Sequence, residues 1–304
     1  MPCRASLLFG IALLAVAGCT SRTASEQEEA TGIVDRSFLT HERWNDGRAE
    51  IAFYDVQRAR NAYGEQDSLQ FTVGTYLVKH GFNPEKLTKA TTQEETRTPS
   101  FKYALFYEFA SGSYQYKRNY VVNSRQATLQ PLKASFTSFD WCSNQYRELA
   151  FPQDAEPFWL KRSDDYGNAR RTFEGRRNTF TSSQLPLLVR ALDFQGTDTR
   201  QFWVVTQEGA FVRAEATRAG RDTLRLSTGA TPAERIAVRY DAPAPSMIAG
   251  EAGQAETYWR GAGPWRLLLR IESDGYEMQL REHLRSPYWQ ENVYDRLRRI
   301  SERP

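Results

Sequence analysis

Cys19 is the residue whose surroundings point most clearly to a chemical reaction. It ends the run Val16-Ala17-Gly18-Cys19, directly after the apolar stretch 7–17, and Arg4 gives the segment a positive start. A charged start, a short apolar stretch and small residues before the cut are the marks of a cleaved export signal. The two small residues before the cysteine fit a peptidase cleft, and the thiol that follows them can be acylated.

This segment resembles the lipoprotein signal peptides of bacteria, in which the lipidated cysteine becomes the first residue of the mature protein. The resemblance implies three acyl chains on Cys19 and a permanent attachment, since each buried methylene contributes about 0.8 kcal/mol. Thr20 follows the cysteine, and in a host with two membranes this sorting pattern favours the outer one. A secretory signal cut at another small residue stays open. An uncleaved anchor does not fit, because a bilayer span needs about 20 apolar residues.

Charge and cysteine content narrow the class of protein. After removal of residues 1–18 the chain has 39 Lys and Arg against 37 Asp and Glu, a near balance that argues against a nucleic-acid partner. Cys3 leaves with the signal and Cys19 is the acylation site, so Cys142 has no partner for an intrachain disulfide. Residues 19–35 are polar without periodicity and predict a tether. We expect residues 36–304 to form a single β-rich extracytoplasmic domain.

Alternation of apolar and polar residues predicts strands over most of that domain. It is clearest at 69–77, 101–109 and 114–122. Ser273-Asp274-Gly275 predicts a hairpin turn, Glu208-Gly209 and Ala219-Gly220 two further turns, and 242–253 a long loop. Short turns between strands predict a mainly β fold, with a large antiparallel, curved sheet or open barrel.

One or two short helices complete the expected fold. Ser182-Ser183 could cap a helix over 184–194, where leucines recur on one side. Ser286-Pro287 predicts the start of a C-terminal helix over 287–301. Its apolar residues recur at intervals of three and four, a stripe that would pack on the sheet.

No residues are predicted to be catalytic or to bind a metal or cofactor. His41, His80 and His283 lie far apart without the short ligand spacing of a zinc site. The carboxylates in 164–168 and the pair Asp193 and Asp198 are typical of turns and lack EF-hand spacing. Phosphate-binding glycine loops and the nucleophile elbow are missing from the sequence. A carboxylate pair for glycoside hydrolysis stays open, because such a pair is set by distance in space.

Cys142 and the aromatic residues have structural explanations. No histidine lies near Cys142 in the sequence to activate its thiol, so we expect a buried cysteine beside a packed Trp141. Phe, Tyr and Trp make up 13% of the chain. On the faces of a sheet they would build a core, or alternatively line a cavity for an apolar ligand.

Three parts of the chain carry a further resemblance. The run Trp44–Glu50, the pair Trp141-Cys142 and the stretch 264–289 resemble a group of uncharacterised bacterial lipoproteins that carry the label "septum formation inhibitor Maf". The resemblance covers roughly residues 38–290 and implies a β-rich, membrane-tethered extracytoplasmic domain. Maf proteins proper are cytoplasmic nucleotide pyrophosphatases of α/β type, unlike an exported, strand-rich chain, so no catalytic residue is carried over.

These observations favour a non-enzymatic lipoprotein of the cell envelope, anchored in the outer membrane. We expect it to bind an apolar or envelope-derived ligand, or a partner protein, with the membrane reached through the acyl anchor and no role for nucleic acid. An envelope hydrolase of glycan or peptidoglycan is the alternative, and a Maf-type nucleotide pyrophosphatase ranks third.

Overall fold

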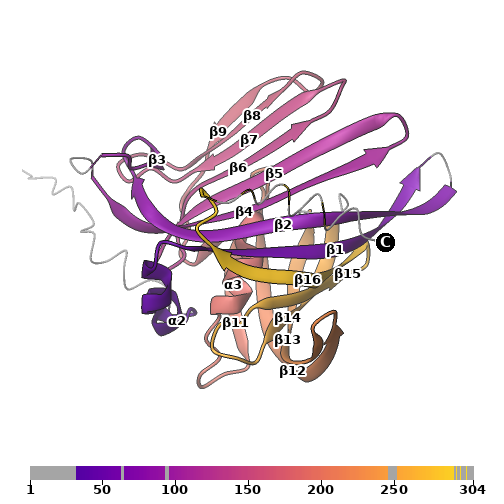
Figure 1. Ribbon diagram of the computed structural model, residues 1–304. Helices are drawn as coiled ribbons and strands as arrows, with labels where there is room; N and C mark the ends of the chain where they lie inside the picture. The colour runs from indigo at the N-terminus through magenta and orange to yellow at the C-terminus, as the bar shows by residue number, and fades with distance from the viewer. Residues whose placement is uncertain are drawn as a thin grey trace, which may run out of the picture. The chain divides into compact units, whose positions relative to one another are not determined.

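The computed structural model describes residues 32–62, 65–92, 96–245 and 252–290, together with 292, 295 and 299. In these residues sixteen strands form one sheet (Figure 1). The strands are β1 (Ala49–Ala62), β2 (Glu65–Asn83), β3 (Thr88–Lys89), β4 (Thr98–Ser111), β5 (Tyr114–Arg125), β6 (Pro131–Phe139), β7 (Asn144–Ala150), β8 (Phe158–Ser163), β9 (Ala169–Thr172), β10 (Thr179–Thr181), β11 (Thr199–Val205), β12 (Phe211–Leu226), β13 (Gly229–Pro245), β14 (Ala252–Gly261), β15 (Leu268–Ser273) and β16 (Tyr276–Ser286). The helices are α2 (Arg36–Thr40) and α3 (Leu185–Ala191), and the 3-10 turns are η1 (Glu42–Asn45) and η2 (Ser182–Gln184).

The sheet is strongly curved but its backbone hydrogen bonds do not close it. Its order runs β10-β11-β12-β13-β14-β15-β16-β1-β2-β4-β5-β6-β7-β8-β9, with β3 paired to β2. Every pairing is antiparallel except the short parallel one between β10 and β11. The mainly β, antiparallel, open-barrel fold expected from the alternation is confirmed, and so are the strands at 69–77, 101–109 and 114–122 and the hairpin at Asp274-Gly275.

Two of the turn and loop predictions are wrong. β12 runs through Ala219-Gly220, where a bulge between Arg218 and Gly220 takes the place of a turn. Gly220 has φ +124°, and a glycine within a strand often marks such a bulge. The expected loop at 242–253 is partly strand, because Ala244 pairs with Gly253. In both places cross-strand pairing prevails over local composition.

The two helix predictions have different outcomes. The helix expected over 184–194 is confirmed as α3 with narrower bounds. The predicted serines do not cap it: they lie in the preceding η2 turn, which has a capping box of Thr181 and Gln184, and the N-cap residue of α3 is Gln184. At the C-terminus, residues 287–290 form a turn closed by a 2.7 Å hydrogen bond from Gln290 N to Pro287 O. Residues 291, 293–294, 296–298 and 300–304 lie outside the described part, so the helix over 287–301 stays a prediction there.

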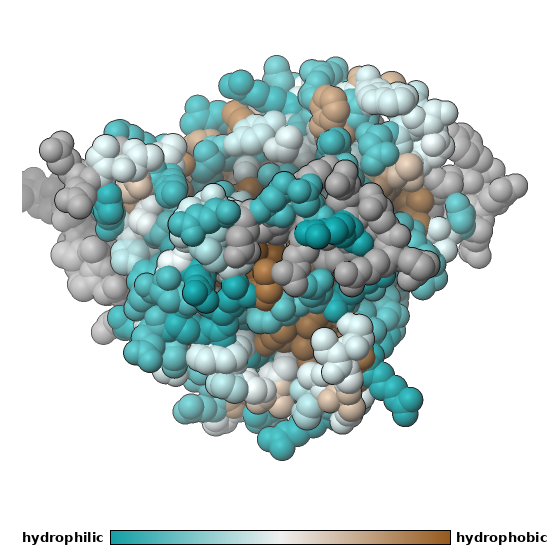
Figure 2. All heavy atoms as spheres, in the orientation of Figure 1, coloured by the Kyte–Doolittle hydropathy of each residue, from teal (hydrophilic) through white to brown (hydrophobic). Residues whose placement is uncertain are grey.

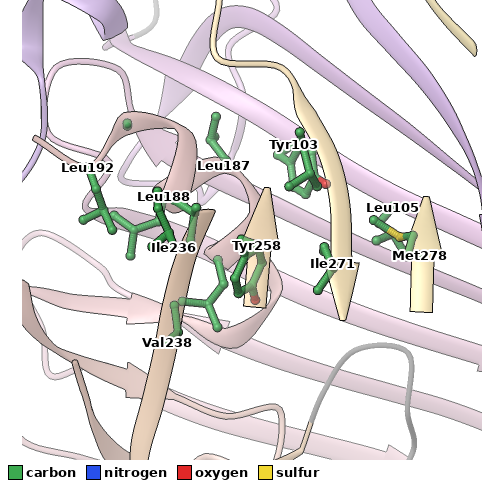
Figure 3. Close-up of a cluster of buried hydrophobic side chains, with 14 of the residues drawn as sticks. Tyr103, Leu105, Leu187, Leu188, Leu192, Ile236, Val238, Tyr258, Ile271 and Met278 are labelled. Atoms are coloured by element: carbon green, nitrogen blue, oxygen red, sulfur yellow. The ribbon is translucent and has the colours of Figure 1, made fainter. Parts of the chain in front are cut away.

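Helix α3 fills the inside of the curved sheet. All seven of its residues are buried, as expected for a helix that is apolar on nearly every side. Figure 3 shows Leu188 of α3 and Leu192 beside Ile236 of β13, and Leu105 of β4 beside Met278 of β16. All of them belong to one buried cluster. On the face shown in Figure 2, apolar residues gather in a central recess, whereas most of the visible surface around it is hydrophilic.

A buried ion pair holds α3 to the central strands. Arg190 Nη1 of α3 lies 2.6 Å from Glu50 Oε1 of β1, and each residue is only 4% exposed. The other guanidinium nitrogens of Arg190 donate to the carbonyls of Arg266, at 2.9 Å, and Trp265, at 3.0 Å. Burial alone would raise the pKa of Glu50, but Arg190 and His283 lower it well below its usual range. The carboxylate is therefore charged and matched inside the protein.

A second arginine secures the C-terminal end of α3. Arg260 Nη1 donates to the carbonyls of Val189, Arg190 and Leu192, at 2.9, 3.1 and 2.9 Å. Its Nη2 lies 2.6 Å from Glu234. A cation at a helix C-terminus satisfies the last carbonyls and complements the helix dipole. β14 is thereby joined to the C-terminal end of α3, whereas the η2 turn precedes its N-terminal end.

Side chains close the gap between the two ends of the sheet. Trp159 of β8 donates from Nε1 to the carbonyl of Gln207, at 2.8 Å, and Arg147 pairs with Glu208 at 2.8 Å. The next residue of this turn, Gly209, has φ +71°, and a Cβ there would lie 2.8 Å from Trp159. The predicted Glu208-Gly209 turn is confirmed, and its glycine permits the close approach.

Replacing Glu50 tests the importance of the buried pair. Glu50→Gln leaves the Arg190 charge buried without a counter-ion, so we expect the free energy of unfolding in urea to fall by about 3–5 kcal/mol. Glu50→Gln/Arg190→Met should recover part of that loss. Lys117→Gln, which breaks the exposed 3.2 Å pair with Glu108, should cost less than about 1 kcal/mol. An equal loss in Glu50→Gln and Lys117→Gln would contradict the assignment.

Candidate functional site

The described interior of the sheet is a packed core. Beside α3 the structure encloses a cavity of about 10 Å³, lined by residues that include Glu50, Tyr54, Tyr103 and Arg190. That volume accommodates about one water molecule. The aromatic residues on the inner face of β4 pack against α3 and neighbouring strands. Of the two roles that the sequence left open for them, the one in the core is observed here.

A much larger cavity lies on the outer face of the sheet. Its volume is about 620 Å³, within the range of about 300–1,000 Å³ that is typical of small-molecule sites. We call it the lysine pocket. It is lined by Gly47, Val78, Lys79, His80, Phe82, Leu87, Thr88, Lys89, Lys102, Val121, Asn123, Lys133, Tyr288 and Trp289.

Strand register builds the floor of the lysine pocket. Val78 of β2 pairs with Lys102 of β4, Lys102 with Asn123 of β5, and Asn123 with Lys133 of β6. Directly paired residues point to the same side of a sheet, so these side chains form one row across four strands. The odd-numbered residues of β4 face the core, which leaves Lys102 on the outer face.

Two loops supply the walls of the lysine pocket. The turn before β3 contributes Leu87, which has φ +52°. On the other side Tyr288 stacks on Tyr76 of β2, with ring centroids 5.3 Å apart, and Trp289 packs edge-on against Tyr288. Trp289 is 57% exposed, so its ring stands at the rim. Apolar walls therefore rise over a partly cationic floor.

The lysine pocket has an excess of positive charge. Four lysines line it and no Asp or Glu does. Lys133 lies 3.0 Å from Glu148, which is outside the lining. Lys79 is hydrogen-bonded to Asn45, and the Lys102 ammonium lies 5.3 Å from the centre of the Tyr76 ring. In the part of the chain that the structure describes, no ion pair joins Lys79, Lys89 or Lys102 to a carboxylate.

His80 is the other titratable group of the lysine pocket. Its Nε2 lies 3.0 Å from Asn123 Oδ1, which as an oxygen accepts, so Nε2 carries a hydrogen. Burial, and then the charges of Lys89 and Lys102, lower the pKa of His80, against an opposing effect of the Asn123 hydrogen bond. The imidazole is therefore neutral near pH 7, and a bound anion would reverse the balance.

The other histidines serve packing and ion pairing. His41 lies edge-on to Trp265, with centroids 4.9 Å apart, and its Nδ1 accepts from Arg43 N. His283 lies 3.8 Å from Glu50 Oε2. Within the described ranges no group of three or more His, Cys, Asp and Glu residues is placed to hold a metal ion.

The expectation of a buried Cys142 is wrong. Cys142 is exposed, and Trp141 is 72% exposed. Both lie in the turn between β6 and β7, where Asp140 Oδ1 accepts from Cys142 N at 2.8 Å and from Ser143 N at 3.1 Å. This local capping holds the pair outward, a geometry that sequence neighbours alone do not reveal. Cys19, the predicted lipidation site, lies outside the described residues.

The acidic residues singled out in the sequence belong to turns and surface pairs. Asp164 accepts from Asn144 N at 2.9 Å, Asp193 from Gln195 N at 2.9 Å, and Asp198 pairs with Arg218 at 2.5 Å. A carboxylate pair for hydrolysis is not found in either cavity described above: Glu50 stands alone in the small one and the lysine pocket has none.

Two buried carboxylates, Glu50 and Glu256, were not singled out in the sequence. Glu256 of β14 accepts hydrogen bonds from the hydroxyls of Tyr240, at 2.7 Å, Tyr258, at 2.6 Å, and Tyr276, at 2.9 Å. Burial and the Glu256 charge raise the pKa of Tyr240 and Tyr258 well above its usual range, so the phenols remain donors. In the sequence, the i, i+2 spacing of Glu256 and Tyr258 indicates that the two side chains lie on the same face of a strand. The sequence does not indicate that Tyr240 and Tyr276, on other strands, also reach Glu256.

Comparison with known proteins gives one structural similarity. No protein-family model and no curated protein matches this chain. Among solved structures, the crystal structure titled as a beta-barrel-like protein of domain of unknown function DUF1849 from Brucella abortus is similar, with a TM-score of 0.47 and 7% sequence identity over 78% of this chain and 97% of that one. No helix in the described residues is long and apolar enough to span a membrane.

The titration of His80 reports directly on the lysine pocket. We expect its NMR midpoint in the ligand-free protein to lie below the ordinary value of 6.5 and to rise when dodecyl phosphate is added. In the ligand-free protein the pKa of His80 is lower than in the unfolded chain, so the unfolded chain binds more protons near this pH. The free energy of unfolding should therefore fall as pH drops through 6.5. His80→Gln, which also assigns the signal, should lack that part of the decrease. A midpoint at or above 6.5 in the free protein would contradict this geometry.

Proposed function

We propose that this protein is a non-enzymatic lipoprotein of the cell envelope that binds an anionic amphiphile in the lysine pocket. The observation that carries the proposal is the lining itself, with four lysines, no carboxylate and a set of apolar and aromatic side chains around about 620 Å³. The predicted acyl anchor at Cys19 would hold this site close to a membrane.

The chemistry of the pocket selects the class of ligand. Lys89 and Lys102 lack carboxylate partners in the described residues, so a phosphate, sulfate or carboxylate group could replace the water around their ammonium groups. Charge-assisted hydrogen bonds of this kind are the stronger ones in proteins. Val78, Phe82 and Trp289 offer apolar surface next to those cations. A ligand with an anionic head and an apolar body satisfies both halves of the lining.

The same lining supports binding over catalysis. It contains no cysteine, serine or carboxylate, and His80 directs its Nε2 hydrogen to Asn123. An activated nucleophile needs a base within hydrogen-bonding reach, and this pocket offers no such pair among its lining residues. The packed interior around α3 also favours the outer face as the place for a ligand.

Binding of two amphiphiles with opposite heads tests the ligand class. By calorimetry below the critical micelle concentrations, dodecyl phosphate should bind and dodecyltrimethylammonium should bind at least tenfold more weakly. Lys89→Gln/Lys102→Gln should weaken the phosphate at least tenfold, since hydrogen bonds to charged groups contribute about 1.5–3 kcal/mol each before solvent screening.

Lys117→Gln, which removes an exposed lysine on the distal part of β5, is the matched control and should leave the affinity unchanged. Trp289→Ala should weaken both amphiphiles by a similar factor, because it removes apolar wall and no charge. Equal affinity for the two heads, or an affinity insensitive to Lys89→Gln/Lys102→Gln, would refute the proposed site.

The anchor is tested separately from the pocket. In a bacterial host with two membranes, the full chain should carry three acyl chains on Cys19 by mass spectrometry and stay with the membranes after a carbonate wash. Cys19→Ser should appear in the carbonate-soluble fraction, and Cys142→Ser should behave like the parent chain. An unmodified Cys19, or membrane retention of Cys19→Ser after the wash, would remove the anchor from the proposal.

A further inference from the structure

Exposed aromatic side chains gather at one end of the β4–β9 part of the sheet. Tyr114, Phe139, Trp141 and Tyr166 are 41%, 46%, 72% and 69% exposed, four of the six large hydrophobic residues found exposed in the described part. They lie in or beside the turns β4–β5, β6–β7 and β8–β9. In an antiparallel sheet these three turns are at the same end, as Figure 1 shows. We call these four residues the aromatic turn surface.

Hydrogen bonds between and within the turns hold these rings outward. Asp140 caps the turn that carries Trp141. Asp164 Oδ2 accepts from the backbone N and the side-chain Nδ2 of Asn144, at 2.9 and 3.1 Å, and so ties two neighbouring turns together. Ser163 Oγ accepts from Tyr166 N at 3.1 Å. The backbone of the β6–β7 and β8–β9 turns, which carry Trp141 and Tyr166, is therefore held by hydrogen bonds.

Positive charge lies immediately behind the aromatic rings. Lys161, Arg162 and Arg170 flank the β8–β9 turn, and Arg162 and Arg170 are exposed. None of the three has an ion pair with a carboxylate within the described ranges. Asp140 and Asp164 accept backbone hydrogen bonds of the turns, and Asp165 is a further, exposed carboxylate in the β8–β9 turn. At about 3.3 Å per residue, the cations lie within about 10 Å of the turn.

We propose that the aromatic turn surface inserts into the headgroup region of an anionic phospholipid bilayer. Trp and Tyr rings favour the membrane–water interface, because one end of each ring is apolar and the other forms hydrogen bonds. Cations set back by about 5–10 Å meet the phosphates when the rings reach the acyl boundary. Each such cation contributes about fivefold to the affinity for an anionic surface. This inference is independent of both the lysine pocket and the Cys19 anchor.

The exposed area favours a bilayer over a partner protein. With about 200 Å² per aromatic side chain, the four exposed fractions amount to about 450 Å². A stable protein interface buries about 800 Å² on each partner. Three separate protruding turns also enter a soft interface more readily than they match a rigid surface.

Cys142, the one cysteine among the described residues, provides a local probe of insertion. In the full chain with Cys3→Ser and Cys19→Ser, Cys142 is the remaining thiol and can be labelled with acrylodan. Vesicles of phosphatidylcholine with 30% phosphatidylglycerol should shift the emission to the blue, and brominated lipid should quench it. The same label at Thr228, introduced as Thr228→Cys with Cys142→Ser, lies in the exposed β12–β13 turn and should not respond.

Vesicle sedimentation of the unlabelled Cys19→Ser chain completes the test. Trp141→Ala/Tyr166→Ala should weaken partitioning at least fivefold, and Trp265→Ala, which removes an exposed ring outside both the aromatic turn surface and the lysine pocket, should not. Arg162→Gln/Arg170→Gln should abolish the preference for phosphatidylglycerol over pure phosphatidylcholine. A Cys142 label that is silent on vesicles would overturn the inference, and so would self-association that is lost in Trp141→Ala/Tyr166→Ala.

Discussion

The buried pair of Glu50 and Arg190 is the interaction on which the arrangement of this fold depends. A curved sheet of this size needs something to fill its inner face, and a seven-residue helix would not remain there by propensity alone. Arg190 ties the helix to β1 in the middle of the sheet order, and Arg260 ties its C-terminal end to β14. Separating a buried pair leaves an uncompensated charge, so positions of α3 that part Arg190 from Glu50 are disfavoured.

The interior around α3 is filled, and the larger of the two cavities described above lies on the outer face of the sheet. The aromatic side chains on the inner face of β4 pack against α3 and the neighbouring strands. On the outer face the same strand presents Lys102 to the lysine pocket, whereas its far end leads to the turn beside Tyr114. In the same set of strands, alternate side chains build the core on the inner face and the lysine pocket on the outer face, and the turns at the strand ends carry the aromatic turn surface.

Much of the fold could be predicted from the sequence, because alternation and turn residues act locally. The strand at 101–109 and the Asp274-Gly275 hairpin needed no knowledge of distant residues. The lysine pocket could not be predicted in this way. Its floor joins Val78, Lys102 and Lys133, which are brought together only by the register of β2, β4, β5 and β6. The prediction that Cys142 is buried failed for the same reason. Its exposure depends on where β6 and β7 end and on the hydrogen bonds of Asp140 in the turn between them.

The two edges of this unclosed sheet carry their own protection against aggregation. Free strand edges invite pairing with another chain, and short, charged or covered edges discourage it. β9 has only four residues, all exposed, and two of them are arginines. β10 has three residues, all buried, and its last residue, Thr181, is the N-cap of the η2 turn that follows. Neither end of the incomplete ring of hydrogen bonds therefore offers a long strand that a second copy could readily extend.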